Sequence, residues 1–275
     1  MDLGLAGKTA IVTGGSGGIG RGLVIGFAEE GARVVVATRD ALQGQKVVDA
    51  CKGLPGQAVV VPTDVTSTDS VAAMLAEARR RFGPIDVLVN NAGGVAYPRP
   101  SIEKPRDEMQ WELDLNIWGV VNCTRAVCEE MIARRSGSII NITSNSALLG
   151  EAAQMVTHYA GTKGYVMSWS KALAFEWGQH GVRINCVAPG WIVPWEQSHA
   201  GAGSFWQKYG YTFFGTPEQV AGQAEAGALP SVQNQPIRRI GRPEDMAGIV
   251  LFLASERASF ITGQLISVSG GAYMP

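Results

Sequence analysis

Short apolar runs alternate along this chain with longer segments in which apolar residues recur at helical spacing. The runs are rich in Val and Ile, as buried β-strands are. Helical spacing lies between them, for example over Ser70–Phe82 and Met109–Arg135. We expect strands at Lys8–Thr13, Ala32–Ala37, Ala58–Pro62, Ile85–Val89, Gly137–Ile142, Arg183–Val187 and Gln264–Val268.

This alternation indicates an α/β protein. Strands that are apolar along their whole length are buried on both faces, which favours a parallel sheet with helices on either side. No internal repeat, low-complexity tract or linker divides the chain. We therefore expect a single-domain, doubly wound parallel sheet (Rossmann-type) with helices on both faces over residues 1–275, long enough to bury a substantial core.

One segment, at about residues 191–237, departs from the pattern. It is rich in Gly, Pro and Gln, and long irregular segments of this kind are usually lids or binding loops. The alternative is that its aromatic side chains pack as a local core or against another subunit. These aromatic residues are Trp191, Trp195, Phe205, Trp206, Tyr209, Tyr211, Phe213 and Phe214.

A glycine-rich turn follows the first expected strand and precedes a helical segment. In that order, free amide groups and the positive end of the helix dipole converge, and glycine lets the backbone approach a pyrophosphate. The spacing at Gly14, Gly18 and Gly20 is G-x-x-x-G-x-G. A flexible linker is the alternative, but a linker would not join an apolar strand to an apolar helix.

Tyr159 and Lys163 stand four residues apart, a spacing that places both side chains on one helix face. A phenol, with an ordinary pKa of about 10, exchanges protons poorly at neutral pH. A fixed ammonium nearby favours the phenolate and lowers that pKa. The pair is a candidate acid/base for a carbonyl or an alcohol, although taken alone it could equally be a solvated surface pair.

Together these features resemble the short-chain dehydrogenase/reductase family. Asn90–Gly93, after the fourth expected strand, matches that family's N-N-A-G motif, and Pro189–Gly190, after the sixth, matches its P-G motif. The landmarks follow the family order from about residue 7 to residue 272. The resemblance implies hydride transfer with a nicotinamide cofactor, and it implies that the segment at 191–237 closes over the substrate.

The resemblance also implies catalytic roles. Tyr159 would give a proton to the carbonyl oxygen during reduction and take it back during oxidation. Lys163 would lower the pKa of Tyr159 and hold the nicotinamide ribose. Ser144 would hydrogen-bond the same oxygen, and Asn116 would hold a water that links Lys163 to solvent. Ser146 is a competing serine, but Ser144 fits the family frame without a gap.

The implied cofactor site combines the glycine turn with the ends of several strands. Pro194 stands where relatives often carry a threonine near the nicotinamide carboxamide, and proline offers neither hydroxyl nor N–H. The Ile192 backbone would then carry more of that contact, while Asp64 and Val65 would meet the adenine. The expected cofactor-binding residues are Gly14, Ser16, Gly17, Gly18, Ile19, Gly20, Arg39, Asp64, Val65, Asn91, Tyr159, Lys163 and Ile192.

The choice of cofactor rests on the end of the second expected strand, Thr38 and Arg39. A carboxylate there would bind the ribose of NAD and repel a 2′-phosphate, whereas arginine offers a planar fork suited to phosphate. We therefore expect NADP(H). NAD(H) stays possible, because many NADP-dependent relatives carry a basic residue in the glycine turn where this chain has Gly17. Alternatively, Arg39 is an ordinary surface residue beside Asp40.

Composition excludes several function classes. The net charge is −1 and no basic stripe suggests nucleic acid, while no apolar run is long enough to span a bilayer. The beginning of the chain lacks the order of a signal peptide. The 4 cysteines show no C-x-x-C spacing and the 3 histidines are scattered, so we expect reduced thiols and no metal site. The expected location is cytoplasmic.

Three functions remain open. The first is an NADP(H)-dependent ketone reductase or alcohol dehydrogenase for a bulky, mostly apolar small molecule. The second is an NAD-dependent secondary-alcohol dehydrogenase on the same fold. The third is a cofactor-binding regulator without catalysis, against which the intact set Asn116, Ser144, Tyr159 and Lys163 argues.

The resemblance further implies a homo-oligomer, a tetramer or a dimer. The long helices at Met109–Arg135 and from Tyr159 to about Gly178 would form the contacts. The second of these carries the large apolar residues Trp169, Leu173 and Phe175. The alternative is that these side chains face the sheet of their own subunit.

Overall fold

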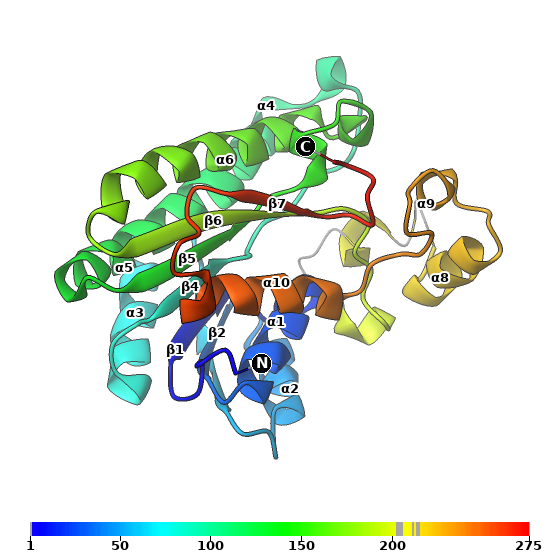
Figure 1. The fold of residues 1–275 in the computed structure, drawn as a ribbon. Coiled ribbons are helices and arrows are strands. Elements are labelled where there is room, and N and C mark those ends of the chain that lie inside the picture. The colour runs from blue at the N-terminus through cyan, green and yellow to red at the C-terminus, as the bar shows by residue number, and fades with distance from the viewer. Residues whose placement is uncertain (1, 202–205, 211, 213–214, 275) are drawn as a thin grey trace.

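A seven-stranded sheet forms the centre of the computed structural model, which describes residues 2–201, 206–210, 212 and 215–274. All strand pairs are parallel, and the order is β3-β2-β1-β4-β5-β6-β7 (Figure 1). The predicted α/β, doubly wound fold is confirmed. The strands are β1 (Thr9–Thr13), β2 (Arg33–Thr38), β3 (Gln57–Pro62), β4 (Val87–Asn90), β5 (Gly137–Ile142), β6 (Val182–Pro189) and β7 (Leu265–Val268).

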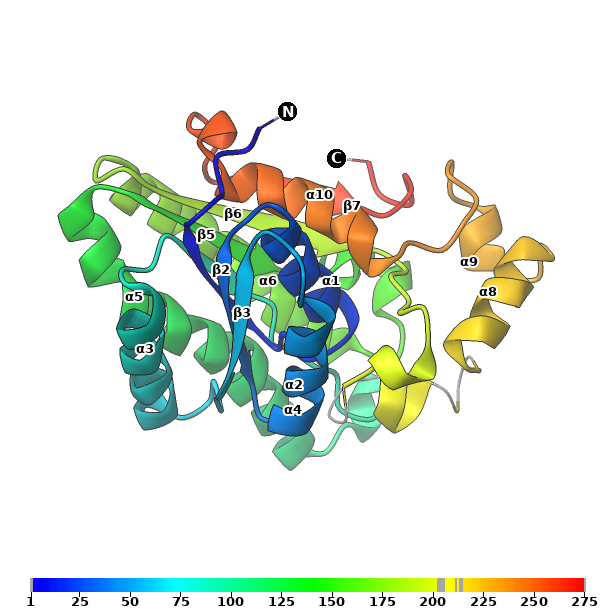
Figure 2. The ribbon, with the colours of Figure 1, turned by 90° about the horizontal axis from the view of Figure 1, so that it is seen from below.

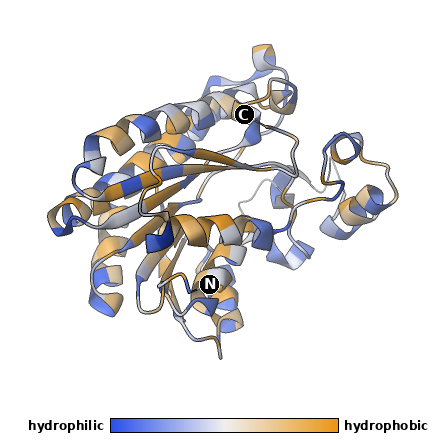
Figure 3. Cartoon of the chain, in the orientation of Figure 1, coloured by the Kyte–Doolittle hydropathy of each residue, from blue (hydrophilic) through white to orange (hydrophobic). Residues whose placement is uncertain are grey.

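Helices cover both faces of this sheet (Figures 1 and 2). Along β1, Ala10 and Val12 pack into the core beneath α1 and α10, while Ile11 packs into the core beneath α3, α5 and α6. Apolar residues accordingly line the strands and the inner faces of the helices (Figure 3). The helices are α1 (Gly18–Glu29), α2 (Ala41–Ala50), α3 (Thr68–Phe82), α4 (Arg106–Leu113), α5 (Gly119–Arg134), α6 (Thr157–Gly178) and α10 (Pro243–Ala254).

The helix expected at Met109–Arg135 differs in both bounds and shape. It begins earlier, at Arg106, directly after Pro105, and it ends at Arg134, because Arg135 takes a left-handed conformation with φ 52°. A π-helical turn, η2 (Asp114–Trp118), separates α4 from α5. Such turns are short and frequent at functional sites. This one contains Asn116.

The segment at 191–237 is more regular than we expected. It contains the 3₁₀ turn η5 (Gln197–His199), the π-helical turn η6 (Trp206–Gly210), α8 (Pro217–Glu225) and α9 (Pro230–Gln233). Figure 1 shows α8 and α9 standing to one side of the sheet. No helix within the described ranges is long and apolar enough to cross a membrane.

A small core of its own supports this segment. Trp191 and Trp206 pack against that core, with ring centroids 6.4 Å apart, so the local-core alternative describes these two residues. Tyr209 instead meets the ring of Tyr97, with centroids 5.3 Å apart. Trp195 is half exposed and stacks under the Arg242 guanidinium. The remaining aromatic residues of the prediction, Phe205, Tyr211, Phe213 and Phe214, lie outside the described residues.

Candidate active site

The carboxyl ends of β1 and β4 meet where the strand order reverses, which is the usual ligand position in doubly wound sheets. A cavity opens there, lined by the glycine turn, the ends of β2, β3 and β5, and α6. Most of the expected cofactor residues line it. They are Gly14, Ser16, Gly17, Gly18, Ile19, Arg39, Asp64, Val65, Asn91, Tyr159, Lys163 and Ile192.

The glycine turn fits a pyrophosphate. Gly14 has φ 62°, and a Cβ there would approach within 3.0 Å of Ala92 Cα. Gly18 opens α1 with φ 51° and faces open space, so the amide groups of the first helical turn are accessible to an anion. Gly20, expected to contact the cofactor, lies behind the turn instead, where a Cβ would overlap Gly14 O. Gly20 therefore shapes the turn.

Part of the 191–237 segment crosses this turn. Ala200 and Gly201 line the cavity, and a Cβ at Gly17 would overlap the Gly201 backbone nitrogen. The Gln43 side chain of α2 donates a hydrogen bond to Ser198 O over 2.7 Å. The segment therefore packs directly on the cofactor loop as well as on its own core.

Asn91 braces the turn from β4. Its side-chain amide donates to Thr13 O over 2.9 Å and to Gly14 O over 3.1 Å. The Thr13 hydroxyl in turn accepts hydrogen bonds from the backbone N–H groups of Asn91 and Ala92, both at 3.0 Å. These bonds tie the ends of β1 and β4 together, so Asn91 both lines the cavity and holds its floor.

At the end of β2, the Ser16 and Thr38 hydroxyls bond each other over 2.8 Å. Asp40 caps α2 by accepting from the backbone N–H of Gln43, so its carboxylate is engaged within its own helix. Arg39 is exposed on the rim of the cavity. No ion pair joins Arg39 to another described residue, which leaves the guanidinium able to bind a ligand at the rim.

Tyr159 and Lys163 lie on α6 and both line the cavity. Ser144 is the hydrogen-bonding neighbour that lowers the pKa of the Tyr159 phenol, and its hydroxyl bonds that of Ser146 over 2.7 Å. Lys163 is buried, donates to Ile142 O over 2.9 Å, and lies 5.7 Å from the centre of the Tyr159 ring. The three expected residues therefore meet, although Ser144 comes from the end of β5.

Burial dominates the electrostatics of this pair. It raises the pKa of the Tyr159 phenol to about 12, a shift that the Ser144 hydrogen bond opposes and the negative charge of Glu112 adds to. Burial also lowers the pKa of the Lys163 ammonium to about 8. The pKa of Tyr159 is therefore raised overall in the protein by itself, because the desolvation of the phenolate is the largest cause, and the lowering of this pKa by Lys163 stays a prediction.

Asn116 lies in the π-helical turn and is fully buried. Its side-chain amide donates to Gly94 O and its side-chain oxygen accepts from Gly94 N, both over 2.9 Å. A Cβ at Gly93 would lie 3.0 Å from both Asn116 Oδ1 and Lys163 Nζ. Asn116 and Lys163 therefore flank Gly93, and the Asn116 side chain holds the loop after β4.

Sequence reasoning missed a polar network inside the sheet. The Asn90 amide donates to Asn141 Oδ1 over 2.8 Å and to the Thr124 hydroxyl over 2.9 Å, and the Asn141 amide donates to Ser170 Oγ over 2.8 Å. All four residues are buried. Their signal in the sequence is asparagine within otherwise apolar strands, since a buried polar group requires a partner.

It also missed a buried carboxylate, Glu112, one helical turn before Asn116. Acidic residues are almost never fully buried unless paired, so a glutamate on the same helix face as a buried Asn116 was the available signal. Among the residues that the structure describes, no group of His, Cys, Asp and Glu is placed to hold a metal ion.

Comparison with known proteins shows which family has a site of this kind. A family model described as short chain dehydrogenase matches residues 8–198, and one described as Enoyl-(Acyl carrier protein) reductase matches residues 215–273. L-fucose dehydrogenase of Bos taurus is 38% identical over 97% of this chain and 90% of its own length. The 3-oxoacyl-(acyl-carrier-protein) reductase of Thermotoga maritima is 33% identical over 97% of this chain and 98% of its own.

Solved structures agree. A short-chain type dehydrogenase/reductase from Mycobacterium marinum superimposes with a TM-score of 0.83, at 35% identity, over 100% of this chain and 99% of that one. A 7α-hydroxysteroid dehydrogenase complexed with NADH and 7-oxo glycochenodeoxycholic acid gives 0.82, at 33% identity, over 98% and 96%. The chain therefore belongs to the short-chain dehydrogenase/reductase family, whose members use a nicotinamide cofactor to oxidise CH–OH groups or reduce C=O groups.

Proposed function

We propose that this enzyme transfers a hydride between NADP(H) and a ketone or secondary alcohol that is bulky and mostly apolar. The observation that carries the proposal is that Tyr159 and Lys163 line the cavity that the glycine turn shares, with Ser144 next to the phenol. That arrangement puts a proton donor and a hydroxyl where one carbonyl oxygen could meet both.

The chain's own residues would handle the proton. At neutral pH a phenol with a pKa of about 12 is protonated and able to donate to the carbonyl oxygen, and Ser144 would stabilise the negative charge that develops there. Lys163 stays charged below about pH 8 and would hold the nicotinamide ribose. Asn116 would help to hold a water that leads from Lys163 to solvent. The bound nicotinamide supplies or accepts the hydride.

Arg39 supports the choice of NADP(H). It lies on the cavity rim beside the paired Ser16 and Thr38 hydroxyls, and the neighbouring Asp40 carboxylate is occupied as a helix cap. A 2′-phosphate at this rim would meet the planar guanidinium of Arg39, and the Asp64 carboxylate, which also lines the cavity, already accepts hydrogen bonds from Thr66. The hydroxysteroid dehydrogenase that resembles this chain is complexed with NADH, so the NAD-dependent alternative stays open.

The walls of the cavity support a bulky, mostly apolar substrate. Val95, Leu115, Pro194 and Trp206 are among the residues that line it. A structural relative holds 7-oxo glycochenodeoxycholic acid, a large ring ketone. Other relatives are named as an L-fucose dehydrogenase and a 3-oxoacyl-(acyl-carrier-protein) reductase, so the family fold alone does not determine the substrate.

The direct test is a screen of ketones and secondary alcohols with both cofactors, followed by nicotinamide absorbance. With any active substrate, Tyr159→Phe should lose about 10²–10⁴-fold in turnover, because general acid–base catalysis contributes that much, while cofactor affinity stays unchanged. Turnover in the variant equal to wild type would remove Tyr159 as the proton donor. If wild type turns over no carbonyl or alcohol yet binds cofactor, the regulator alternative would replace the enzyme.

Arg39→Ala tests the cofactor. The kcat/KM with NADP(H) should fall by about 10–100-fold, the scale of a lost hydrogen bond to a charged group, while the value with NAD(H) stays nearly constant. Both are measured with one fixed substrate. A wild type that already prefers NAD(H), or a variant that loses equally with both cofactors, would make Arg39 a surface residue. The cytoplasmic location also remains a prediction.

A further inference from the structure

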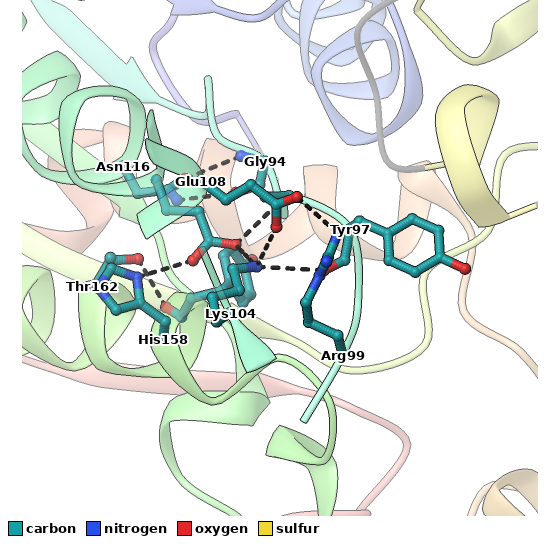
Figure 4. Close-up of polar contacts among 11 residues, drawn as sticks. Gly94, Tyr97, Arg99, Lys104, Glu108, Asn116, His158 and Thr162 are labelled. Atoms are coloured by element: carbon teal, nitrogen blue, oxygen red, sulfur yellow. Dashed lines mark hydrogen bonds and ion pairs between the residues drawn. The ribbon is translucent and has the colours of Figure 1, made fainter. Parts of the chain in front are cut away.

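A buried ionic cluster includes Lys104 and His158 (Figure 4), and His158 is the neighbour in sequence of the proposed proton donor. Glu112 of α4 is 0% exposed. Its Oε1 accepts hydrogen bonds from Lys104 Nζ and from Ala96 N, both over 2.9 Å, and its Oε2 lies 2.9 Å from His158 Nδ1. His158 directly precedes Tyr159 in the first turn of α6. One carboxylate thus holds three donors from three segments.

The segments that it joins form one side of the active site. Ala96 follows Gly94 and Val95, which line the cavity, and Lys104 belongs to the loop that leads into α4. The same loop is tied to the chain before α6, because Arg99 N donates to Met155 O over 2.9 Å. The cluster therefore sets where the cavity wall stands relative to the helix that carries Tyr159.

An outer layer of charge surrounds Lys104. Its ammonium lies 3.7 Å from Glu108 Oε2 and 3.4 Å from Tyr97 O, and Arg99 pairs with Glu108 over 2.7 Å. Breaking a buried pair by removing one partner is costly, whereas the intact pair adds little stability over an apolar replacement. Such a cluster is better explained by the geometry that it imposes than by stability.

We infer that Glu112 is a positioning residue for the reaction proposed above: through His158 and Ala96 it fixes the Tyr159 side chain against the substrate side of the cavity. The inference rests on that proposed function. Glu112 acts through other groups, because its carboxylate is fully enclosed and points at His158, Lys104 and Ala96 rather than at the space for a substrate.

Its charge gives the inference a specific signature. Burial is the largest cause of the raised pKa of Tyr159, and the negative charge of Glu112 raises it further, while Ser144 lowers it. Replacing Glu112 by Gln removes that negative charge, so the phenol should lose its proton at lower pH. The charged groups that face Tyr159 or its neighbours are Lys163 from α6, Glu112 from α4, and, around Glu112, Lys104, His158, Glu108 and Arg99.

The experiment measures the pH dependence of the reduction rate and the cofactor Kd in four proteins. In Glu112→Gln, kcat should fall roughly tenfold, as expected for a misplaced catalytic group, with the cofactor Kd unchanged. Lys163 itself loses its proton near pH 8, so the limb to follow is the later alkaline one, where Tyr159 is deprotonated. This limb should move down by on the order of 0.5 pH unit or more. Glu103→Gln makes the same change on an exposed carboxylate next to Lys104 in the loop before α4. It should leave kcat and the alkaline limb as in wild type.

The double variant Glu112→Gln/Lys104→Met separates charge from packing. It removes one negative and one positive charge, so the alkaline limb should return towards its wild-type position while kcat stays low. General loosening of the structure would not reverse the limb in this way. If Glu112→Gln alone does not fold, the charge-balanced double variant still carries the test: low kcat at unchanged cofactor Kd supports the inference, and wild-type kcat overturns it.

The remaining outcomes are distinct. An active wild type with an unmoved limb and unchanged kcat in Glu112→Gln overturns the role of Glu112 and leaves the proposed function intact. If wild type has no turnover at all, the proposed function fails and the positioning role fails with it. In that case an ultraviolet difference titration against Tyr159→Phe, which needs no substrate, shows separately whether Glu112→Gln lowers the pKa of the phenol.

Discussion

Lys163 illustrates how one side chain serves function at the expense of stability. Its ammonium is buried, donates to Ile142 O, and has its pKa lowered to about 8 by burial. In the unfolded chain its pKa is near 10.4, so folding must confine a charge that water would hold better.

Lys163→Met should therefore stabilise the fold at pH 7 while abolishing most activity. The expected gain in the free energy of unfolding is on the order of 1–3 kcal/mol, since the lowered pKa sets an upper limit and the lost bond to Ile142 O offsets part of it. Thermal melting of both proteins at pH 7 checks this. A less stable variant would show that the hydrogen bond outweighs the buried charge.

The pH dependence of that gain follows from linkage. A lowered pKa in the folded state means that the wild type regains stability as pH rises from about 8 towards the unfolded value. The difference between Lys163→Met and wild type should be full well below pH 8 and should shrink from about pH 8 towards the unfolded pKa of about 10.4. A constant difference across that range would exclude titration of Lys163 as its cause.

Sequence spacing identified Tyr159 and Lys163 because both lie on one helix, where four residues make one turn. The identification of Ser144 needed the family resemblance, since the approach of Ser144 to Tyr159 depends on how β5 packs against α6. Glu112 and Asn141 escaped notice because their partners come from distant segments. A buried polar group is visible in a sequence only as an exception, and its purpose appears only when its partners are placed.

At the scale of elements, α8 begins with a helix-capping sequence that our sequence analysis did not use. Thr216 accepts a hydrogen bond from Gln219 N, the Gln219 side chain accepts from Thr216 N, and Pro217 occupies the first helical position. This capping box is readable from the letters T-P-E-Q alone. The abundance of Gly, Pro and Gln favoured an irregular segment instead. The π-helical turn at Asp114–Trp118, by contrast, leaves no comparable signal in residue periodicity.

Thr216→Ala should weaken α8 by about 1 kcal/mol, the usual cost of losing a helix cap. Hydrogen exchange should show faster exchange for the amides of α8 and unchanged protection in β4 and β5. Thr68→Ala, which replaces a threonine at the first residue of α3 rather than at its cap, provides a matched substitution. Equal effects of the two changes on α8 would mean that Thr216 does not hold the helix.

At the scale of the whole molecule, α6 divides its large apolar residues between two surfaces. Leu173 is buried in the core beneath the sheet and Trp169 packs against that core, so these two follow the alternative of facing their own sheet. Phe175 is 93% exposed. Trp118 at the start of α5 and Tyr165 of α6 are also exposed. The predicted assembly through these helices therefore depends on Phe175, Trp118 and Tyr165.

Phe175→Glu should lower the mass measured by light scattering at micromolar concentration, because a charge would be buried at a symmetric contact. Leu42→Glu, on the exposed surface of α2, should leave the mass unchanged. A wild type that is already monomeric would remove the prediction of a tetramer or dimer.

The alternation of strands and helices was enough to predict a parallel sheet covered on both faces. It did not contain the order of the strands, because alternation is the same for any right-handed winding of βαβ units. The reversal between β1 and β4 places the cavity, and only the structure supplies it.

The contact between Gly17 and Gly201 restricts how this enzyme could change its cofactor. Any side chain at position 17 would collide with the backbone at Gly201, so a basic residue cannot replace Gly17 while the segment at 197–201 stays in place. Two changes would have to occur together, and the first alone would be harmful. If the proposed role of Arg39 holds, single mutations that change cofactor selectivity are expected at the end of β2, around Thr38 and Arg39, rather than at Gly17.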